Sequence, residues 1–350
     1  MAARRATICV LGLGEMGLIH ARNLARVPGV DLSVASSRRP HAAAVAADLH
    51  APTHYGSYEE ALAAPDVAGV VIATPPASHP ALITAAARAG KHIFSEKPLG
   101  YAVADILPAA AAINAAGIRF MAGFMRRWDT GYAAAAATVR SGDLGAPLVL
   151  KCTSGDPAYP EKYQRESSNN AMLLDLAVHD IDLARWLLGG RVRRVFAITD
   201  ALVYPRLKEL GDADVCVATL EMEGGGLATL HLSRALHYGY NVTSELVCAR
   251  GTLAVGELKE TPLVTITGAG ATTDVAPAFP ERFRTAFAAE MDAFAALVTA
   301  ADGTPPAAAA DSVGAPGQFP SLADGIEATA VAEALVASSR KGVPVDVVYP

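Results

Sequence analysis

The stretch ATICVLGLGEMGLIHARNL, residues 6 to 24, opens with a short apolar run rich in branched side chains, which is typical of a buried parallel strand. Gly12, Gly14 and Gly17 follow in the spacing G-x-G-x-x-G. In such a loop the first glycine makes the tight turn, the second lets a pyrophosphate approach the backbone, and the third lets the helix pack on the strand. A helix is expected over about 15 to 27, and its N-terminus favours phosphate. The stretch therefore predicts a dinucleotide site rather than a plain tight turn.

The alternation of strands and helices continues to residue 124. Apolar branched runs predict further strands, and alanine-rich segments, some closed by glycine, predict helices. Because alternating strands and helices form βαβ units around a parallel sheet, residues 1–123 are predicted to form a Rossmann dinucleotide-binding domain of the α/β class. Further strands are expected at 31–36, 67–74, 92–98 and 118–124, and helices at 41–49, 79–90 and 104–117.

The pattern changes after residue 124, where several strands follow one another with glycine-rich turns between them. This arrangement is typical of a mainly antiparallel sheet. Residues 124–350 are therefore predicted to form an α+β domain, and the last helix is a candidate to pack back on the first domain. Helices are expected at 130–141, 173–186, 283–300 and 322–340, strands at 147–153, 193–199, 214–222, 226–233, 244–255 and 262–268, and an Ala/Pro/Gly surface loop at 302–320.

The composition indicates how many domains, which partners and which cellular location to expect for this protein. A chain of 350 residues suits two domains, and 52% hydrophobic with 18% charged residues indicates large buried surfaces. The formal net charge of −6 gives no electrostatic reason to expect nucleic acid or a membrane as a partner. The four scattered cysteines, without a CxxC motif, predict neither a disulfide framework nor a structural zinc site. No apolar run reaches the roughly 18 residues of a membrane span, and no signal-type block precedes the fold, so the protein is expected in the cytoplasm.

The end of the second predicted strand bears on the choice of cofactor. An acidic residue about 20 positions after the glycines would bind the ribose hydroxyls of NAD. That place holds Ser36, Ser37, Arg38 and Arg39, and Asp31 lies at the other end of the strand. Without a carboxylate to repel a 2′-phosphate, and with guanidiniums able to bind it, NADP is favoured and NAD stays possible. The competing interpretation is that both arginines are solvated surface residues.

Three further segments bear on the chemistry: ATPPASH (73–79), SEKPLG (95–100) and LLDLAVHDIDLARW (173–186). The first two follow parallel strands, and ligands of such sheets bind at the carboxyl ends of the strands. Lys97 is therefore expected near the cofactor, where a lysine can relay protons, although a lone lysine is more often an ordinary surface residue. Asp175 and His179 would share one helix face, separated by roughly 6 Å of rise. By themselves they fit either a structural pair or an acid/base pair.

GLGEMGLIHARNL, TPPASH, EKP and DLAVHD occur in this order and spacing, and together they resemble the motifs of the Gfo/Idh/MocA oxidoreductases. The resemblance covers essentially the whole chain. Segments 123–132, 233–240, 281–298 and 320–335 look closest to the inositol 2-dehydrogenase group. The resemblance implies a Rossmann domain joined to a substrate-binding domain with a large open sheet, whose outer face often mediates homodimers or homotetramers. It implies no metal.

The resemblance also implies an NAD(P)-dependent dehydrogenase that oxidises a ring secondary alcohol of a cyclitol or sugar. Hydride passes to the nicotinamide C4 while Lys97 or His179 takes the hydroxyl proton, and Asp175 orients or tunes them. Further substrate contacts are expected from Arg127, Asp156, Tyr238 and Tyr240. Besides the glycines and residues 36–39, cofactor contacts are expected from Glu15, Met16, Thr74, Pro75, His79, Glu96 and Lys97.

Two departures from the family pattern bear on substrate and cofactor. Gly155 stands in SGDP where inositol dehydrogenases of this type often carry an arginine, and the acid common in NAD-dependent members is missing. The alternatives are a reductase acting on a keto sugar or keto cyclitol, and a non-catalytic nucleotide-sensing relative. The intact set of Lys97, Asp175 and His179 argues against the sensor.

Overall fold

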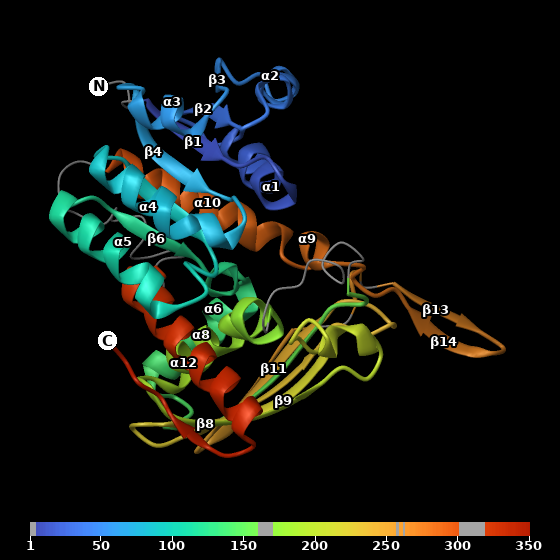
Figure 1. Cartoon of the computed structure of the whole chain (residues 1–350). Helices are drawn as coiled ribbons and strands as arrows, with labels where there is room; N and C mark the ends of the chain where they lie inside the picture. Colours follow the sequence, from blue (N-terminus) through green and yellow to red (C-terminus); the bar gives the residue numbers. More distant parts are fainter. Residues whose placement is uncertain (1–4, 160–170, 257–258, 262, 301–318) are drawn as a thin grey trace. The chain divides into compact units, whose positions relative to one another are not determined.

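Figure 1 shows the computed structural model, which describes residues 5–159, 171–256, 259–261, 263–300 and 319–350. The chain forms two compact units that interleave along the sequence. Unit 1 consists of Met1–Trp128 and Thr285–Ile326, and unit 2 of Asp129–Arg284 and Glu327–Pro350. The single boundary expected between residues 123 and 124 lies near the first change of unit, and it stays a prediction about functional domains.

Unit 1 contains a six-stranded parallel sheet in the order β3-β2-β1-β4-β5-β6. This is the strand order of a Rossmann fold, which confirms the predicted α/β class. β3 and α3 were not predicted from the sequence, because three and six residues are too short to show a clear period. The strands are β1 (Ala6–Leu11), β2 (Val30–Ala35), β3 (Thr53–Tyr55), β4 (Val67–Ile72), β5 (His92–Glu96) and β6 (Phe120–Gly123). The helices are α1 (Glu15–Leu24), α2 (Arg39–Asp48), α3 (Tyr58–Ala63), α4 (His79–Arg88) and α5 (Val103–Ala116), with 3₁₀ turns η1 (Pro76–Ser78) and η2 (Met125–Trp128).

Both faces of this sheet are covered by helices. On one face Cys9, Leu11 and Ile72 pack with apolar residues of α3, α4 and α5. Side chains alternate along a strand, so Phe94 of β5 points to the other face, where its ring lies 5.8 Å from that of Phe294. Phe294 belongs to α10 (Arg284–Thr299), a helix from a distant part of the chain that completes the Rossmann core.

Unit 2 is built on a seven-stranded sheet in the order β12-β11-β7-β10-β9-β8-β15. Only the β10–β7 pair of this sheet is parallel, so the predicted mainly antiparallel sheet is confirmed. The strands are β7 (Pro147–Gly155), β8 (Val192–Asp200), β9 (Val215–Met222), β10 (Leu227–Ser233), β11 (Asn241–Cys248), β12 (Gly251–Val255) and β15 (Val345–Asp346). The helices are α6 (Thr130–Ser141), α8 (Ala177–Leu188) and α9 (Phe279–Arg282), preceded or joined by the turns η3 (Met172–Leu176) and η4 (Pro205–Lys208).

Two strand predictions in unit 2 need correction. The run 244–255 is a hairpin rather than one strand, because a tight turn at Ala249 and Arg250 separates β11 from β12. The strand predicted at 262–268, of which residue 262 lies outside the described residues, does not extend the large sheet: β13 (Val264–Thr267) pairs with β14 (Gly270–Thr273) in a separate two-stranded sheet. This hairpin extends away from the large sheet (Figure 1). The predicted surface loop 302–320 lies almost entirely outside the described residues.

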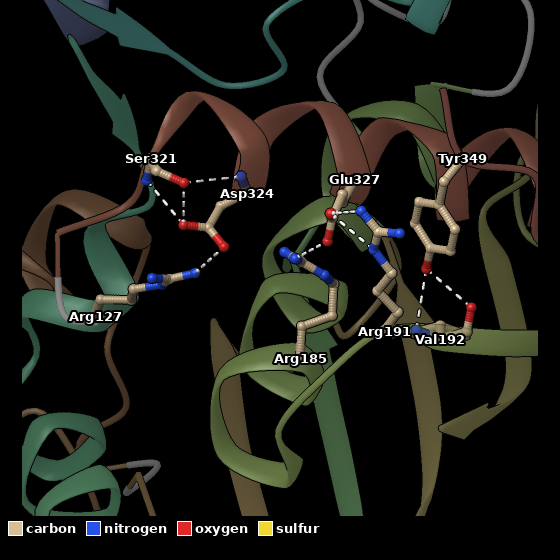
Figure 2. A network of polar contacts seen from close by, with 8 residues as sticks. All are labelled: Arg127, Arg185, Arg191, Val192, Ser321, Asp324, Glu327 and Tyr349. Atoms are coloured by element: carbon tan, nitrogen blue, oxygen red, sulfur yellow. Dashed lines mark hydrogen bonds and ion pairs between the residues drawn. The ribbon is translucent and has the colours of Figure 1, made fainter. Parts of the chain in front are cut away.

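Helix α12 (Leu322–Lys341) begins with residues of unit 1 and continues in unit 2. At its start the Asp324 N–H donates to Ser321 Oγ at 3.1 Å, and the Ser321 N–H donates to the Asp324 carboxylate at 2.8 Å, a reciprocal cap (Figure 2). Further along, Glu327 accepts from Arg185 of α8 and from Arg191 just before β8. These contacts fix the later part of α12 within unit 2.

The four cysteines are all buried thiols, as expected for small apolar side chains. Burial raises the pKa of the Cys9 and Cys216 thiols to about 12, so both stay protonated near neutral pH. Among the described residues no helix combines the length and the apolar character that crossing a membrane requires.

Candidate functional site

The loop between β1 and α1 places its three glycines as a phosphate cradle requires. Gly12 has a φ of +93°, and an added Cβ would lie 2.7 Å from the Ala73 carbonyl oxygen. An added Cβ at Gly17 would lie 1.9 Å from the Gly12 carbonyl oxygen, so a side chain would push the helix off the loop. At Gly14 an added Cβ would meet nothing within 4 Å in the described part of the chain, so the backbone faces open space. The residues present thus fit a pyrophosphate. Glu15 and Met16 follow at the start of α1, and their contact with the cofactor stays a prediction.

The residues that follow β2 differ in their exposure and in their hydrogen-bond and ion-pair partners. Ser36 is buried, and its Oγ accepts from the Arg38 N–H at 3.2 Å, while Ser37 is exposed. Arg39 forms an exposed ion pair with Glu60 at 2.5 Å, a contact that contributes little to stability. Arg38 is exposed, and no acidic side chain pairs with it among the residues described. The segment therefore offers one guanidinium without a competing carboxylate.

Asp31 lies at the start of β2, as expected, and not at the nucleotide end of the strand. Its carboxylate accepts from the Arg5 guanidinium, and this hydrogen bond holds the Asp31 pKa below its usual range. Asp31 is therefore a surface ion-pair partner and offers nothing to the ribose.

One buried histidine joins the segments that follow β4 and β5. The His79 ring nitrogens lie 2.8 Å from the carbonyl oxygens of Thr74 and Pro98. Burial outweighs these two contacts and lowers the pKa of His79. The fully buried ring therefore holds the two segments together, and a contact between His79 and the cofactor stays a prediction. Thr74 is also buried, whereas Pro75 is exposed where the segment turns.

Glu96 ends β5 and holds the backbone of Lys97. The Lys97 N–H donates to Glu96 Oε2 at 3.1 Å, and His20 Nε2 donates to Glu96 Oε1 at 2.7 Å, since a carboxylate only accepts. Glu290 of α10 is fully buried close to this pair. The sequence analysis missed Glu290, although it interrupts an apolar helix face between Phe287 and Phe294, a spacing that would have predicted its burial.

In unit 2, Asp175 and His179 lie on different kinds of helix. Asp175 belongs to η3, which is a π-helical turn, and His179 belongs to the regular helix α8. The expected single α-helix over 173–186 is therefore wrong in its first turn, and the wider turn changes the stacking of residues four apart. π-helical turns are rare and frequently occur at functional sites. His179 is nearly buried on α8.

Asp175 has a cationic partner that the sequence analysis did not assign. Arg234, directly after β10, forms an ion pair with Asp175 at 3.1 Å, and its guanidinium lies 4.8 Å from the centre of the Tyr159 ring. Burial alone would lower the Arg234 pKa, but the nearby carboxylates, Asp175 first and then Asp156, raise it. A permanent positive charge therefore interacts with both of these acids, which were both predicted to contact substrate.

The remaining predicted substrate residues have differing surroundings. Arg127 of η2 is buried and forms an ion pair with Asp324 at 3.1 Å (Figure 2), so contact with a substrate would compete with this carboxylate. The exposed Tyr238 accepts from Asn241 Nδ2 at 2.9 Å, whereas Tyr240 is buried with its ring edge-on to an aromatic neighbour. Lys97 and Arg127 belong to unit 1, and Asp156, Asp175, His179, Tyr238 and Tyr240 belong to unit 2.

Comparison with known proteins extends these observations. Residues 6–124 match the model of an oxidoreductase family with an NAD-binding Rossmann fold, and residues 132–254 match the GFO/IDH/MocA C-terminal domain. The chain is 32% identical to scyllo-inositol 2-dehydrogenase (NAD(+)) of Bacillus subtilis, over 83% of this chain and 85% of that protein. It is 32% identical to myo-inositol 2-dehydrogenase of Thermotoga maritima, over 86% of this chain and 90% of that protein.

Solved structures agree with the sequence relatives. The scyllo-inositol dehydrogenase of Lactobacillus casei with bound NAD(H) and scyllo-inositol superposes with a TM-score of 0.88 at 28% identity, covering 98% of this chain and 99% of that chain. The Rossmann sheet, the glycine cradle and the matches over both halves of the sequence lead to one assignment. The chain belongs to the GFO/IDH/MocA family of oxidoreductases and carries that family's NAD-binding Rossmann domain.

Proposed function

We propose that the protein is an NAD(P)-dependent dehydrogenase that transfers hydride between the nicotinamide and a secondary alcohol of a cyclitol or sugar. The observation that carries this proposal is the similarity, over most of the chain, to proteins named for the 2-dehydrogenation of myo- and scyllo-inositol. Lys97, Asp175 and His179 supply the acid and base groups that the reaction needs.

The proposed roles follow from the chemistry of alcohol oxidation. The nicotinamide cofactor, when bound on the glycine cradle, supplies the hydride acceptor. Lys97 or His179 accepts the hydroxyl proton as the carbon–oxygen bond becomes a carbonyl. Asp175 orients these groups, and Arg234 holds Asp175 in place through their ion pair. Asp156, Arg127, Tyr238 and Tyr240 are the proposed contacts to the other hydroxyls of the ring.

We propose further that the cofactor site prefers NADP to NAD. Residues 36–39 contain no carboxylate to repel a 2′-phosphate, and Arg38 is exposed without an acidic partner in the described part of the chain. A guanidinium binds phosphate with two parallel hydrogen bonds. Arg39 would contribute only by releasing Glu60, so Arg38 is the principal candidate.

We propose that the outer face of the unit 2 sheet binds a second copy of this chain, giving a homodimer or homotetramer. Helix α8 contacts β7 and β10 and covers the inner face. On the outer face Ile198, Val217 and His231 lie side by side on β8, β9 and β10, and Ile198 and Val217 are 62% and 55% exposed. Adjacent exposed apolar side chains are typical of an interface. Light scattering tests this, because a mass of one 36.1-kDa chain would contradict it.

A panel of inositol isomers, glucose and amino-cyclitols, each with NAD and NADP, tests the proposed activity. Reduction of either cofactor with a cyclitol or sugar supports it. Turnover only of a keto compound with reduced cofactor would favour the reductase, which would use the same groups in reverse. Cofactor binding without turnover in either direction would favour a nucleotide sensor. We expect the protein to act in the cytoplasm, where its buried thiols stay reduced.

A further inference from the structure

Three titratable side chains meet inside unit 1 from elements far apart in the sequence. His20 comes from α1, Glu96 from the end of β5, and Glu290 from α10. One ring nitrogen of His20 and one carboxyl oxygen of each glutamate all lie within 4.8 Å of one another. The rings of Phe94 and Phe287 stand edge-on to the His20 ring, at 5.2 and 6.0 Å between centres. The cluster is therefore buried, with aromatic rings against its histidine.

The two carboxyl groups of this cluster differ in the hydrogen bonds that they accept. Glu96 accepts from His20 Nε2 and from the Lys97 N–H, so both of its oxygens have donors. Both oxygens of Glu290 are buried without a hydrogen-bond partner among the described residues, and the His20 Nδ1 is likewise unpartnered there. An ionised carboxylate in such a place would be strongly destabilising, and a second negative charge nearby adds to the cost. Burial first, and then the charge of Glu96, raise the Glu290 pKa well above its usual range.

We propose that Glu290 is a neutral carboxylic acid whose O–H is directed at the His20–Glu96 pair, and that it is a positioning residue for Lys97. The second half of this inference rests on the proposed role of Lys97 in catalysis. A donor from Glu290 adds a third hydrogen bond to Glu96, and Glu96 in turn holds the backbone N–H of Lys97. Rotation of the Glu290 carboxyl group, or one bridging water, would close the remaining gap.

The same three residue types could ligate a metal ion, but the contacts favour a proton. A metal would require both carboxylates ionised, whereas Glu96 already has a donor on each oxygen and Glu290 is fully buried. The other titratable groups close to the cluster are Lys97 and His79, and the His79 pKa is itself affected by the charges of Glu96 and Lys97. A metal is retained as one outcome of the test.

The decisive measurement is the melting temperature as a function of pH for the wild type and Glu290→Gln. Below the unfolded-state pKa of about 4.3, both folded and unfolded chains carry a protonated Glu290. As pH rises above that value, the unfolded chain ionises and the folded chain does not, so the wild type loses stability relative to the variant. We expect the advantage of Glu290→Gln to grow steadily with pH. Glu59→Gln, the same change at an exposed position of unit 1, should show no such growth.

A flat or shrinking advantage of Glu290→Gln would overturn the inference, because it would mean an ionised or unperturbed carboxyl. Stoichiometric metal in the purified wild type, lost in Glu290→Gln, would also overturn it. Both measurements use the protein without substrate. If the protein oxidised no cyclitol or sugar but showed the expected pH dependence, the proposed function would be wrong. The inference that Glu290 is a neutral acid would still be supported.

The positioning role is tested by comparing two substitutions at the same site. Glu290→Gln keeps a donor, whereas Glu290→Met keeps the volume and removes it. We expect Glu290→Met to lower kcat roughly 10- to 100-fold, as small displacements of a reacting group do, with the KM for the cofactor little changed. Glu290→Gln should recover most of that loss. Equal kcat in both variants would overturn the positioning role.

Discussion

Glu290 and Asp175 are both acidic side chains on helices beside a proposed catalytic residue, but their surroundings are opposite. Asp175 has a guanidinium at 3.1 Å and a side chain that is 34% exposed. Glu290 is fully buried and has no cationic partner in the part of the chain that is described. The same functional group therefore has opposite electrostatic surroundings in the two units: a cation beside Asp175 favours the ionised form, and burial of Glu290 favours the neutral form.

The difference teaches what each acid can do. A carboxylate at Asp175, held by Arg234, can polarise or orient a neighbouring base. A neutral Glu290 can only donate or accept a hydrogen bond, so its influence on Lys97 is a matter of geometry rather than charge. Substitutions in the two units test this contrast between Asp175 and Glu290.

The largest effect is expected from substituting Lys97 and His179, the two proposed acid or base groups of the reaction. Lys97→Ala and His179→Ala should each lower kcat by roughly 10²- to 10⁴-fold, because each removes an acid or base from the reaction. The affinity for NADPH, followed by its fluorescence, should change little. Lys208→Ala removes an exposed lysine and should leave kcat unchanged. Loss of cofactor binding without a fall in kcat at saturation would contradict the assignment.

Removing the cation of unit 2 comes next. Arg234→Met leaves Asp175 and Asp156 without their shared positive charge, and should lower the free energy of unfolding by roughly 2–4 kcal/mol. The matched control is Arg193→Met, which breaks an exposed ion pair with Glu221 and should cost less than about 1 kcal/mol. Denaturant unfolding measures both. Similar losses in the two variants would mean that burial does not distinguish the pairs.

The pH dependence of unit 1 is the third test. Because the folded-state pKa of Glu290 is raised, its proton is retained on folding and lost on unfolding above about pH 4.3. The free energy of unfolding of the wild type should therefore fall, relative to Glu290→Gln, by about 1.4 kcal/mol per pH unit until the folded-state pKa is reached. The difference between Arg234→Met and the double variant Arg234→Met/Glu290→Gln should have the same slope, since Arg234 belongs to unit 2. A different slope in this pair would contradict the independence of the two acids.

The smallest effect is expected from placing a new carboxylate in unit 1. Ser36→Asp puts an acid at the end of β2, where it would accept from the ribose hydroxyls and repel a 2′-phosphate. The preference should move toward NAD by about 1–2 kcal/mol, as expected for like charges close to solvent. The ratio of kcat/KM for NADP and NAD measures the shift. An unchanged ratio would place the ribose away from Ser36.

Local signals in the sequence were enough for the Rossmann half. The glycine spacing, the branched strands and the helix-closing glycines each act within a few residues, and the parallel pairing of the strands follows from their alternation with helices. Two elements were not predicted because they are too short to show a period: β3 (Thr53–Tyr55) and α3 (Tyr58–Ala63). The residues of the predicted site were found by motif, while their partners were not.

Those partners could not be read from the sequence because each contact joins distant segments. The Arg234–Asp175 pair spans 59 positions and depends on where β10 ends. The π-helical turn at Met172–Leu176, which carries Asp175, has no signal in the residue pattern, which fits an ordinary α-helix. Glu290 could have been suspected from its place on the apolar face of α10, but nothing local pointed to His20 and Glu96 as its neighbours.

The two-segment composition of unit 1 has a consequence for how the protein is made. Helix α10 supplies Phe294 and Glu290 to a sheet whose last strand is complete about 160 residues earlier. At roughly 5–20 residues per second, the ribosome needs on the order of 10–30 s to bridge that gap. During this time the nascent Rossmann sheet has one face without its final helix, and a fragment ending at Trp128 would keep that apolar face permanently. Synthesis of α10, rather than of the nucleotide motif, is therefore the step after which the sheet of unit 1 can first be covered by all of its helices.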